Sequence, residues 1–180
     1  MDNASQPAQW LRNHHKTLKG LFIQSRSLKL RANEMKENVF KEYFLELDLN
    51  LSIKKNVVYP LLNEKLPGFP NFNDRIKLDE HLKNIEECAN FLLAIKSMSP
   101  SDPARQIRFN ELTSKVNEYL EIEEREIIPF VQTLSEQDQS KLHMSIIQER
   151  ELLYSLPEYQ DARPSVVQNP RGGEQMRKVS

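Results

Sequence analysis

Apolar residues recur every three or four positions through four long stretches of the chain, which is the spacing of one face of an α-helix. One stretch reads Leu78, His81, Ile85, Cys88, Leu92 and Ile95. The pattern predicts long helices over about 7–31, 33–65, 75–97 and 103–134, followed by a short fifth helix up to about residue 153. Four long helices joined by short loops indicate an all-α protein with an up-down-up-down four-helix bundle.

Two segments of this pattern resemble each other. Residues 50–60 read NLSIKKNVVYP, residues 119–129 read YLEIEEREIIP, and the two align without a gap. Leucine, isoleucine and proline match, and Lys54 stands where Glu123 stands. Pro60 is expected to kink or end its helix, and Pro129 is expected near the end of a helix that continues to about Leu134. We expect the two halves of the bundle to be helical hairpins related by rough two-fold symmetry.

Each predicted helix carries one ionisable residue in its apolar face. These residues are His15, Lys54, His81 and Glu123. Taken singly, such a residue is more often a satisfied core side chain, or one that reaches solvent from the edge of the face. Buried ionisable groups are costly unless they pair or bind metal. Because the four could meet at one level of an antiparallel bundle, the pattern predicts a shared polar centre.

The composition limits the partners and the compartment. Charged residues make up 28% and the net charge is −1, so no strong field favours nucleic acid or anionic lipid. No apolar run approaches the roughly 20 residues that a membrane span needs. The single cysteine, Cys88, excludes an internal disulfide and a cysteine-based zinc site. The start of the chain lacks a signal-peptide pattern, and we expect a cytoplasmic protein.

The ends of the chain differ in composition from the bundle. Residues 155–180 contain three prolines, Pro157, Pro164 and Pro170, and few large apolar residues. This composition is typical of disordered segments. We therefore expect a disordered N-terminus over 1–7, the bundle over 8–154, and a disordered tail over 155–180.

At the family level, the chain resembles the hemerythrin-like, HHE-type cation-binding domains. The segments that carry the resemblance are NHHKTLKGLF, LNLSIKKNVVYP, DEHLKNI and YLEIEEREIIPFVQTLSEQD, spread over residues 8–153. The resemblance implies a four-helix bundle around a non-haem di-iron centre that binds or senses oxygen, nitric oxide or iron. In that family, histidines are terminal ligands and two carboxylates bridge the metals.

Fewer than half of the expected ligand positions carry ligand residues here, and Lys77 stands at the upstream ligand position of the third helix. His15, His81 and Glu123 match family ligands, whereas Asn50, Lys54 and Tyr119 replace a histidine, a carboxylate and a histidine. Lys54 is the decisive change, because it removes a bridging carboxylate and adds a cation. At about 4 Å and an effective dielectric constant of about 20, a lysine and a divalent ion repel by about 8 kcal/mol.

The replacements predict a different centre. Since the family's bridging carboxylates face each other, we expect Lys54 and Glu123 to form a buried or half-buried ion pair. Hydrogen bonds to this pair are expected from His15, His81, Asn50 and Tyr119. Breaking one partner of such a pair often costs several kcal/mol.

Two functions follow as hypotheses. The first is a hemerythrin-like domain without a cofactor, which acts as a non-catalytic binding or regulatory module for an unidentified protein or small ligand. The alternative is a residual metal protein in which His15, His81 and Glu123 hold non-haem iron or zinc, with water or Tyr119 completing the shell. A ferritin-like enzyme is disfavoured because the chain has no Glu-x-x-His pair.

Overall fold

The computed structural model describes residues 6–27, 33–73, 76–157 and 159, and these residues form helices and no strand. The long helices are α1 (Gln6–Ser27), α2 (Asn33–Ile53), α5 (Leu78–Lys96), α6 (Pro103–Thr133) and α7 (Glu136–Ser155). After α2 come a π-helical turn, η2 (Lys54–Val58), then α3 (Tyr59–Lys65), a 3₁₀ turn, η3 (Leu66–Gly68), and the short α4 (Pro70–Asn73). The predicted all-α class is confirmed.

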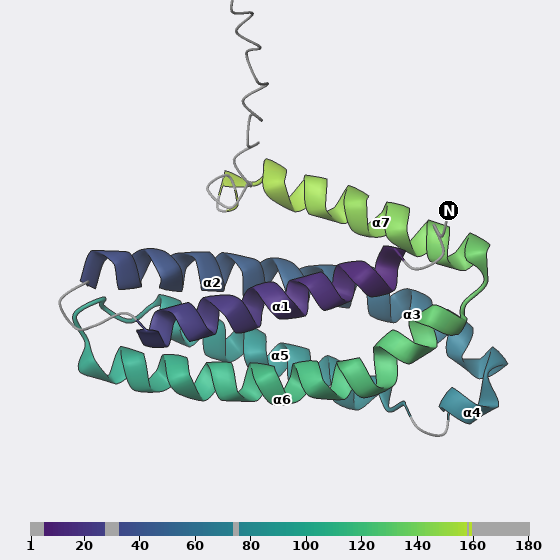
Figure 1. The fold of residues 1–180 in the computed structure, drawn as a ribbon, viewed down its shortest axis with the longest axis horizontal. Helices are drawn as coiled ribbons and strands as arrows, with labels where there is room; N and C mark the ends of the chain where they lie inside the picture. Colours follow the sequence, from purple (N-terminus) through teal and green to yellow (C-terminus); the bar gives the residue numbers. More distant parts are fainter. Residues whose placement is uncertain (1–5, 28–32, 74–75, 158, 160–180) are drawn as a thin grey trace, which may run out of the picture.

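Four helices enclose the core. α1 packs against α2 and α6, and α5 closes the ring by packing against α2 and α6, while successive long helices run in opposite directions (Figure 1). Their apolar faces supply a continuous set of buried side chains. α7 turns back along the bundle and lies against α1, α2 and η2, on the side away from α5 (Figure 1). None of the helices in the described part of the chain has the length and apolar character needed to cross a membrane.

The π-helical turn marks where the second predicted helix departs from regularity. The helix was expected to kink or end near Pro60, and the change begins earlier, at Lys54. The N–H of Tyr59 donates to the carbonyl oxygen of Lys54, five residues back instead of four. Pro60 has no N–H and its ring crowds the preceding turn, so a wider turn before it avoids the clash. A regular helix, α3, then continues with Pro60 in its first turn.

The matching proline in α6 has a different outcome. Pro129 lies inside a helix that continues from Pro103 to Thr133 without a π-helical turn. The start of α6 is capped by Asp102, whose side chain accepts a hydrogen bond from the backbone N–H of Ala104. The two segments with the same sequence pattern therefore have different backbones.

Some predicted boundaries differ from the observed ones. α7 has 20 residues, close to the length of α1, so the fifth helix is not short. α5 begins at Leu78 instead of residue 75. α1 begins at Gln6, within the range assigned to a disordered N-terminus, and Tyr159, within the range assigned to the tail, is buried. Residues 160–180 lie outside the described residues.

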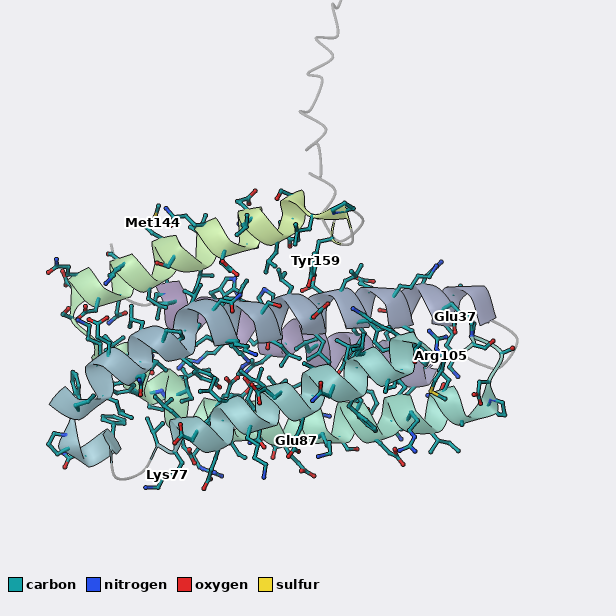
Figure 2. All side chains as sticks on the ribbon, turned by 180° about the vertical axis from the view of Figure 1, so that it is seen from behind. Glu37, Lys77, Glu87, Arg105, Met144 and Tyr159 are labelled. Carbon is teal, nitrogen blue, oxygen red and sulfur yellow. The ribbon has the colours of Figure 1, made fainter. Side chains whose placement is uncertain are left out.

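An ion pair joins α6 to α2 at the end of the bundle that is distant from η2. Arg105 of α6 donates to both carboxylate oxygens of Glu37 of α2, at 2.5 and 2.6 Å (Figure 2). The guanidinium also lies over the rings of Phe40 and Phe44. Arg105 is buried but Glu37 is partly exposed, so solvent helps to satisfy this pair. It ties α6 to α2 beside the aromatic core.

Candidate functional site: a buried ion-pair centre

All six residues singled out from the sequence are buried in the bundle. They come from its four core helices and from η2, and they are His15, Asn50, Lys54, His81, Tyr119 and Glu123. Each helix contributes at least one, as the one-per-helix pattern predicts. A bundle interior normally excludes such groups unless their polar atoms are paired. Their partners therefore decide what this centre can do.

Lys54 and Glu123 form the predicted ion pair. The ammonium of Lys54 donates to Oε2 of Glu123, and both side chains are almost fully buried. The ammonium also lies 4.7 Å from the centre of the Tyr119 ring, a cation–π contact. An isolated ion at this depth is strongly unfavourable, whereas a pair with further hydrogen bonds is tolerated. The predicted partnership between the two repeat segments is confirmed.

Glu123 is the hub of the centre. Its Oε2 accepts a hydrogen bond from the ammonium of Lys54 and also lies 3.0 Å from Nε2 of His15. Its Oε1 accepts hydrogen bonds from the hydroxyls of Tyr59 at 2.5 Å and Tyr119 at 2.7 Å. An ionised carboxylate offers about four acceptor positions. The four protein groups fill them.

His15 links this hub to the surface. Its Nδ1 lies 3.1 Å from Oε1 of Glu124, which also binds the ammonium of Lys19 at 3.2 Å. Carboxylate oxygens only accept hydrogen bonds, so both nitrogens of His15 can be satisfied together when the ring carries two protons. The ring of His15 lies between the buried Glu123 and the half-exposed Glu124. The sequence pattern did not single out Glu124 for this role.

The surroundings favour the ionised carboxylate. Burial alone would raise the pKa of Glu123, but the charge of Lys54 and the hydrogen bonds of His15 and Lys54 lower it to about 2. For Lys54, burial lowers the pKa of the ammonium and Glu123 offsets part of that effect. Burial, reinforced by the charge of Glu123, raises the pKa of the Tyr59 and Tyr119 hydroxyls well above the ordinary value. Both phenols therefore stay protonated and donate to Glu123.

Two predicted hydrogen-bond partners do not contact the hub. Nε2 of His81 lies 3.2 Å from Oε2 of Glu126, and its buried Nδ1 has no hydrogen-bond partner among the described residues. The amide of Asn50 is fully buried, and neither its oxygen nor its nitrogen has a partner within the same part of the chain. The prediction was wrong for these two residues and correct for His15 and Tyr119.

Sequence reasoning missed Tyr59, and the π-helical turn explains why. In a regular α-helix, a residue five positions after Lys54 lies about 140° around the axis, away from the core-facing stripe. The π turn places Tyr59 directly one turn beyond Lys54, since its N–H bonds the carbonyl of Lys54. Pro60 following a tyrosine was the available signal, because a proline within a helix is a common site of such irregularity.

The residues present do not fit a di-iron centre. The ammonium of Lys54 is held where a bridging carboxylate was expected, and the acceptor positions of Glu123 are filled. His81 is turned to Glu126. Across residues 6–27, 33–73, 76–157 and 159, no three or more histidine, cysteine, aspartate or glutamate side chains are grouped to hold a metal ion. The set His15, His81 and Glu123 is thus not assembled as a ligand cluster.

Comparison with known proteins establishes the fold. No protein-family model matches the chain, and no curated protein sequence does either. A solved structure does match: a hemerythrin HHE cation binding domain-containing protein from Mycobacterium kansasii, with a TM-score of 0.65 and 18% sequence identity, over 82% of this chain and 86% of that one. The predicted resemblance is confirmed at the level of structure, and the chain has a hemerythrin-like fold. The cation binding in its name refers to that protein.

Proposed function

We propose that this protein is a hemerythrin-like domain in which a buried ion pair has replaced the di-iron centre, and that it works as a non-catalytic binding or regulatory module. The observation that carries the proposal is the saturation of Glu123. Lys54, His15, Tyr59 and Tyr119 take its acceptor positions, so the carboxylate has none left for a metal. No cofactor is assigned to the centre.

The polar network offers a reason for retaining charge without metal. A metal centre joins four helices through its ligands, and here α1, η2, α3 and α6 are joined through Glu123 instead. Hydrogen bonds to a buried charge are directional, so the network favours one register of the helices. A domain fixed in this way can present its surface to a partner without any chemistry in its core.

Metal analysis of the purified full chain tests the proposal. We expect the natural protein to contain almost no iron or zinc after expression in medium supplemented with both. The triple variant Lys54→Glu, Asn50→His, Tyr119→His restores three ligand types and is expected to gain iron. The matched control, Lys54→Met, removes the cation without adding a ligand and is expected to stay free of iron.

The outcomes separate the candidate functions. Iron or zinc at one or more equivalents in the natural chain would overturn the proposal and support the residual metal site built on His15, His81 and Glu123. Helical content from circular dichroism is recorded for each variant, so a loss of folding is not read as a loss of metal. The natural chain alone decides the main question, because it needs no substitution.

A further inference from the structure

A groove lies on the outside of the bundle, away from the ion-pair centre. One wall comes from η2 and α3, the other comes from α7, and the volume is about 410 Å³. Val57, Leu61 and Leu152 give it apolar lining. Leu152 is 59% exposed, so a chain laid in the groove would remove apolar surface from water.

The polar lining favours a cationic occupant. Two carboxylates, Glu64 and Glu149, line the groove together with one ammonium, Lys141. Lys65, outside the lining, binds Glu64 at 3.2 Å. Asn56 donates to Glu149 across the gap between η2 and α7, at 2.8 Å. Pro60, on the same wall, has no N–H and so cannot satisfy the backbone carbonyls of the preceding turn. The charged residues of the lining therefore carry a net negative charge.

We propose that the C-terminal segment, residues 160–180 of this chain, docks in the groove. The segment carries four basic residues, Arg163, Arg171, Arg177 and Lys178, against the two acidic residues Asp161 and Glu174. Its adjacent valines, 166 and 167, match the apolar lining. Charge complementarity and apolar contact thus point to the same occupant.

The connection to α7 makes this occupant available at high local concentration. α7 forms one wall of the groove and ends at Ser155, and the buried Tyr159 lies just beyond the end of α7 (Figure 2). A helix rises about 1.5 Å per residue, whereas an extended chain spans about 3.3 Å per residue. The segment can therefore return along α7 using fewer residues than the helix. A short tether gives effective concentrations in the millimolar range, so even weak binding keeps the groove occupied.

A spin label at the end of the full chain tests the docking. Ser180→Cys supplies the attachment point, and the natural Cys88 is 2% exposed and so is not expected to react. We expect the label to remove most of the intensity of amide signals in 57–64 and 145–152, compared with a diamagnetic label. Adding Glu64→Lys and Glu149→Lys reverses the charge of the groove and should restore those signals. α6 lies on the opposite side of the bundle from α7 (Figure 1), so Glu121→Lys on α6 is the charge control and should change nothing.

Three results would overturn the proposal. Undiminished signals along both walls would show that the segment does not dock. Signal loss that survives reversal of both glutamates would show that charge does not direct it. Loss that grows with protein concentration would assign the effect to the segment of a second copy. Metal content has no bearing on any of these results, so this proposal and the proposed function fail independently.

Discussion

The two repeat segments of the chain, 50–60 and 119–129, differ at the positions where the polar centre is built. Lys54 faces Glu123, and the two meet in a buried ion pair. The aligned residues four positions earlier, Asn50 and Tyr119, differ more. Tyr119 donates to Glu123, but the amide of Asn50 has no hydrogen-bond partner among the described residues. Residues 119–129 therefore supply the acceptor carboxylate and one of its donors. Residues 50–60 supply the counter-charge and an amide without a partner among the described residues.

The backbones of the two segments differ as well. Pro60 follows a π-helical turn, while Pro129 lies in an uninterrupted α6. α7 packs against η2, and in Figure 1 it lies on the side of the bundle away from α6. The π turn brings Tyr59 onto Glu123, whereas its equivalent in α6, Ile128, is an apolar core residue. A shared sequence pattern thus gave similar helices with unequal roles.

The largest change in stability is expected when the carboxylate of Glu123, which only one of the two segments supplies, is removed. We expect Glu123→Ala to lower the free energy of unfolding by about 3–5 kcal/mol, because it leaves the ammonium of Lys54 buried without a counter-charge. Urea unfolding followed by circular dichroism measures the loss. The double variant Lys54→Met, Glu123→Leu replaces both charges by apolar groups and should recover part of the stability, since Tyr59, Tyr119 and His15 still lose their acceptor. A double variant as unstable as Glu123→Ala would contradict the ion-pair account.

Acid should weaken the same hub. The pKa of Glu123 is lowered to about 2 from 4.5, so between these values the unfolded chain binds more protons than the folded one. Its contribution to stability is complete above the unfolded pKa and is lost as the pH falls towards 2. The full loss is about 3 kcal/mol. Unfolding free energies at a series of acidic pH values test this, and Glu123→Gln should show a shallower dependence than the natural chain.

The equivalent positions Tyr119 and Asn50 should respond in opposite directions. Tyr119→Phe removes a hydrogen bond to a buried carboxylate and should cost about 2 kcal/mol, within the range for bonds to charged groups. Asn50→Leu removes an amide that has no partner among the described residues, and it should leave stability unchanged or raise it by about 1 kcal/mol. Thermal and urea unfolding compare the two. A clear loss of stability in Asn50→Leu would mean that its amide is satisfied in solution.

The smallest effect concerns the two prolines. Pro60→Ala restores an N–H and permits a regular helix, which should turn Tyr59 away from Glu123. In a double-mutant cycle, the cost of Tyr59→Phe should then fall by about 1 kcal/mol relative to its cost in the natural chain. Pro129→Ala is the matched control and should leave the cost of Tyr59→Phe unchanged. Equal costs in all three backgrounds would show that the π turn does not position this tyrosine.

Much of the fold was predictable because helical periodicity is a local property. The spacing of apolar residues located the long helices, and one ionisable residue in each apolar face located the polar centre. The partnership of Lys54 with Glu123 followed from the aligned repeat, together with the family resemblance. The helix boundaries were less accurate, since α5 begins at Leu78 and α7 is as long as a core helix.

Hydrogen-bond partners within the centre could not be predicted in the same way. His81 and Asn50 lie on the expected faces, yet His81 is directed to Glu126 and Asn50 to no protein acceptor or donor within the described part of the chain. Side-chain direction depends on rotamers and on neighbours from other helices, which periodicity does not encode. The contact of Tyr59 with Glu123 was missed for a different reason, because the position of Tyr59 depends on one extra residue in a helical turn.

The sequence by itself determined the helices, the burial of the six polar positions and the pairing of two opposite charges. Apolar spacing specifies which face turns inward, and a buried charge requires a counter-charge whichever helix supplies it. Only the tertiary structure decided that Glu123 is the shared acceptor of four groups and that His15 connects it to Glu124. The physical reason is that a carboxylate has several acceptor positions, and packing alone selects the donors that reach them.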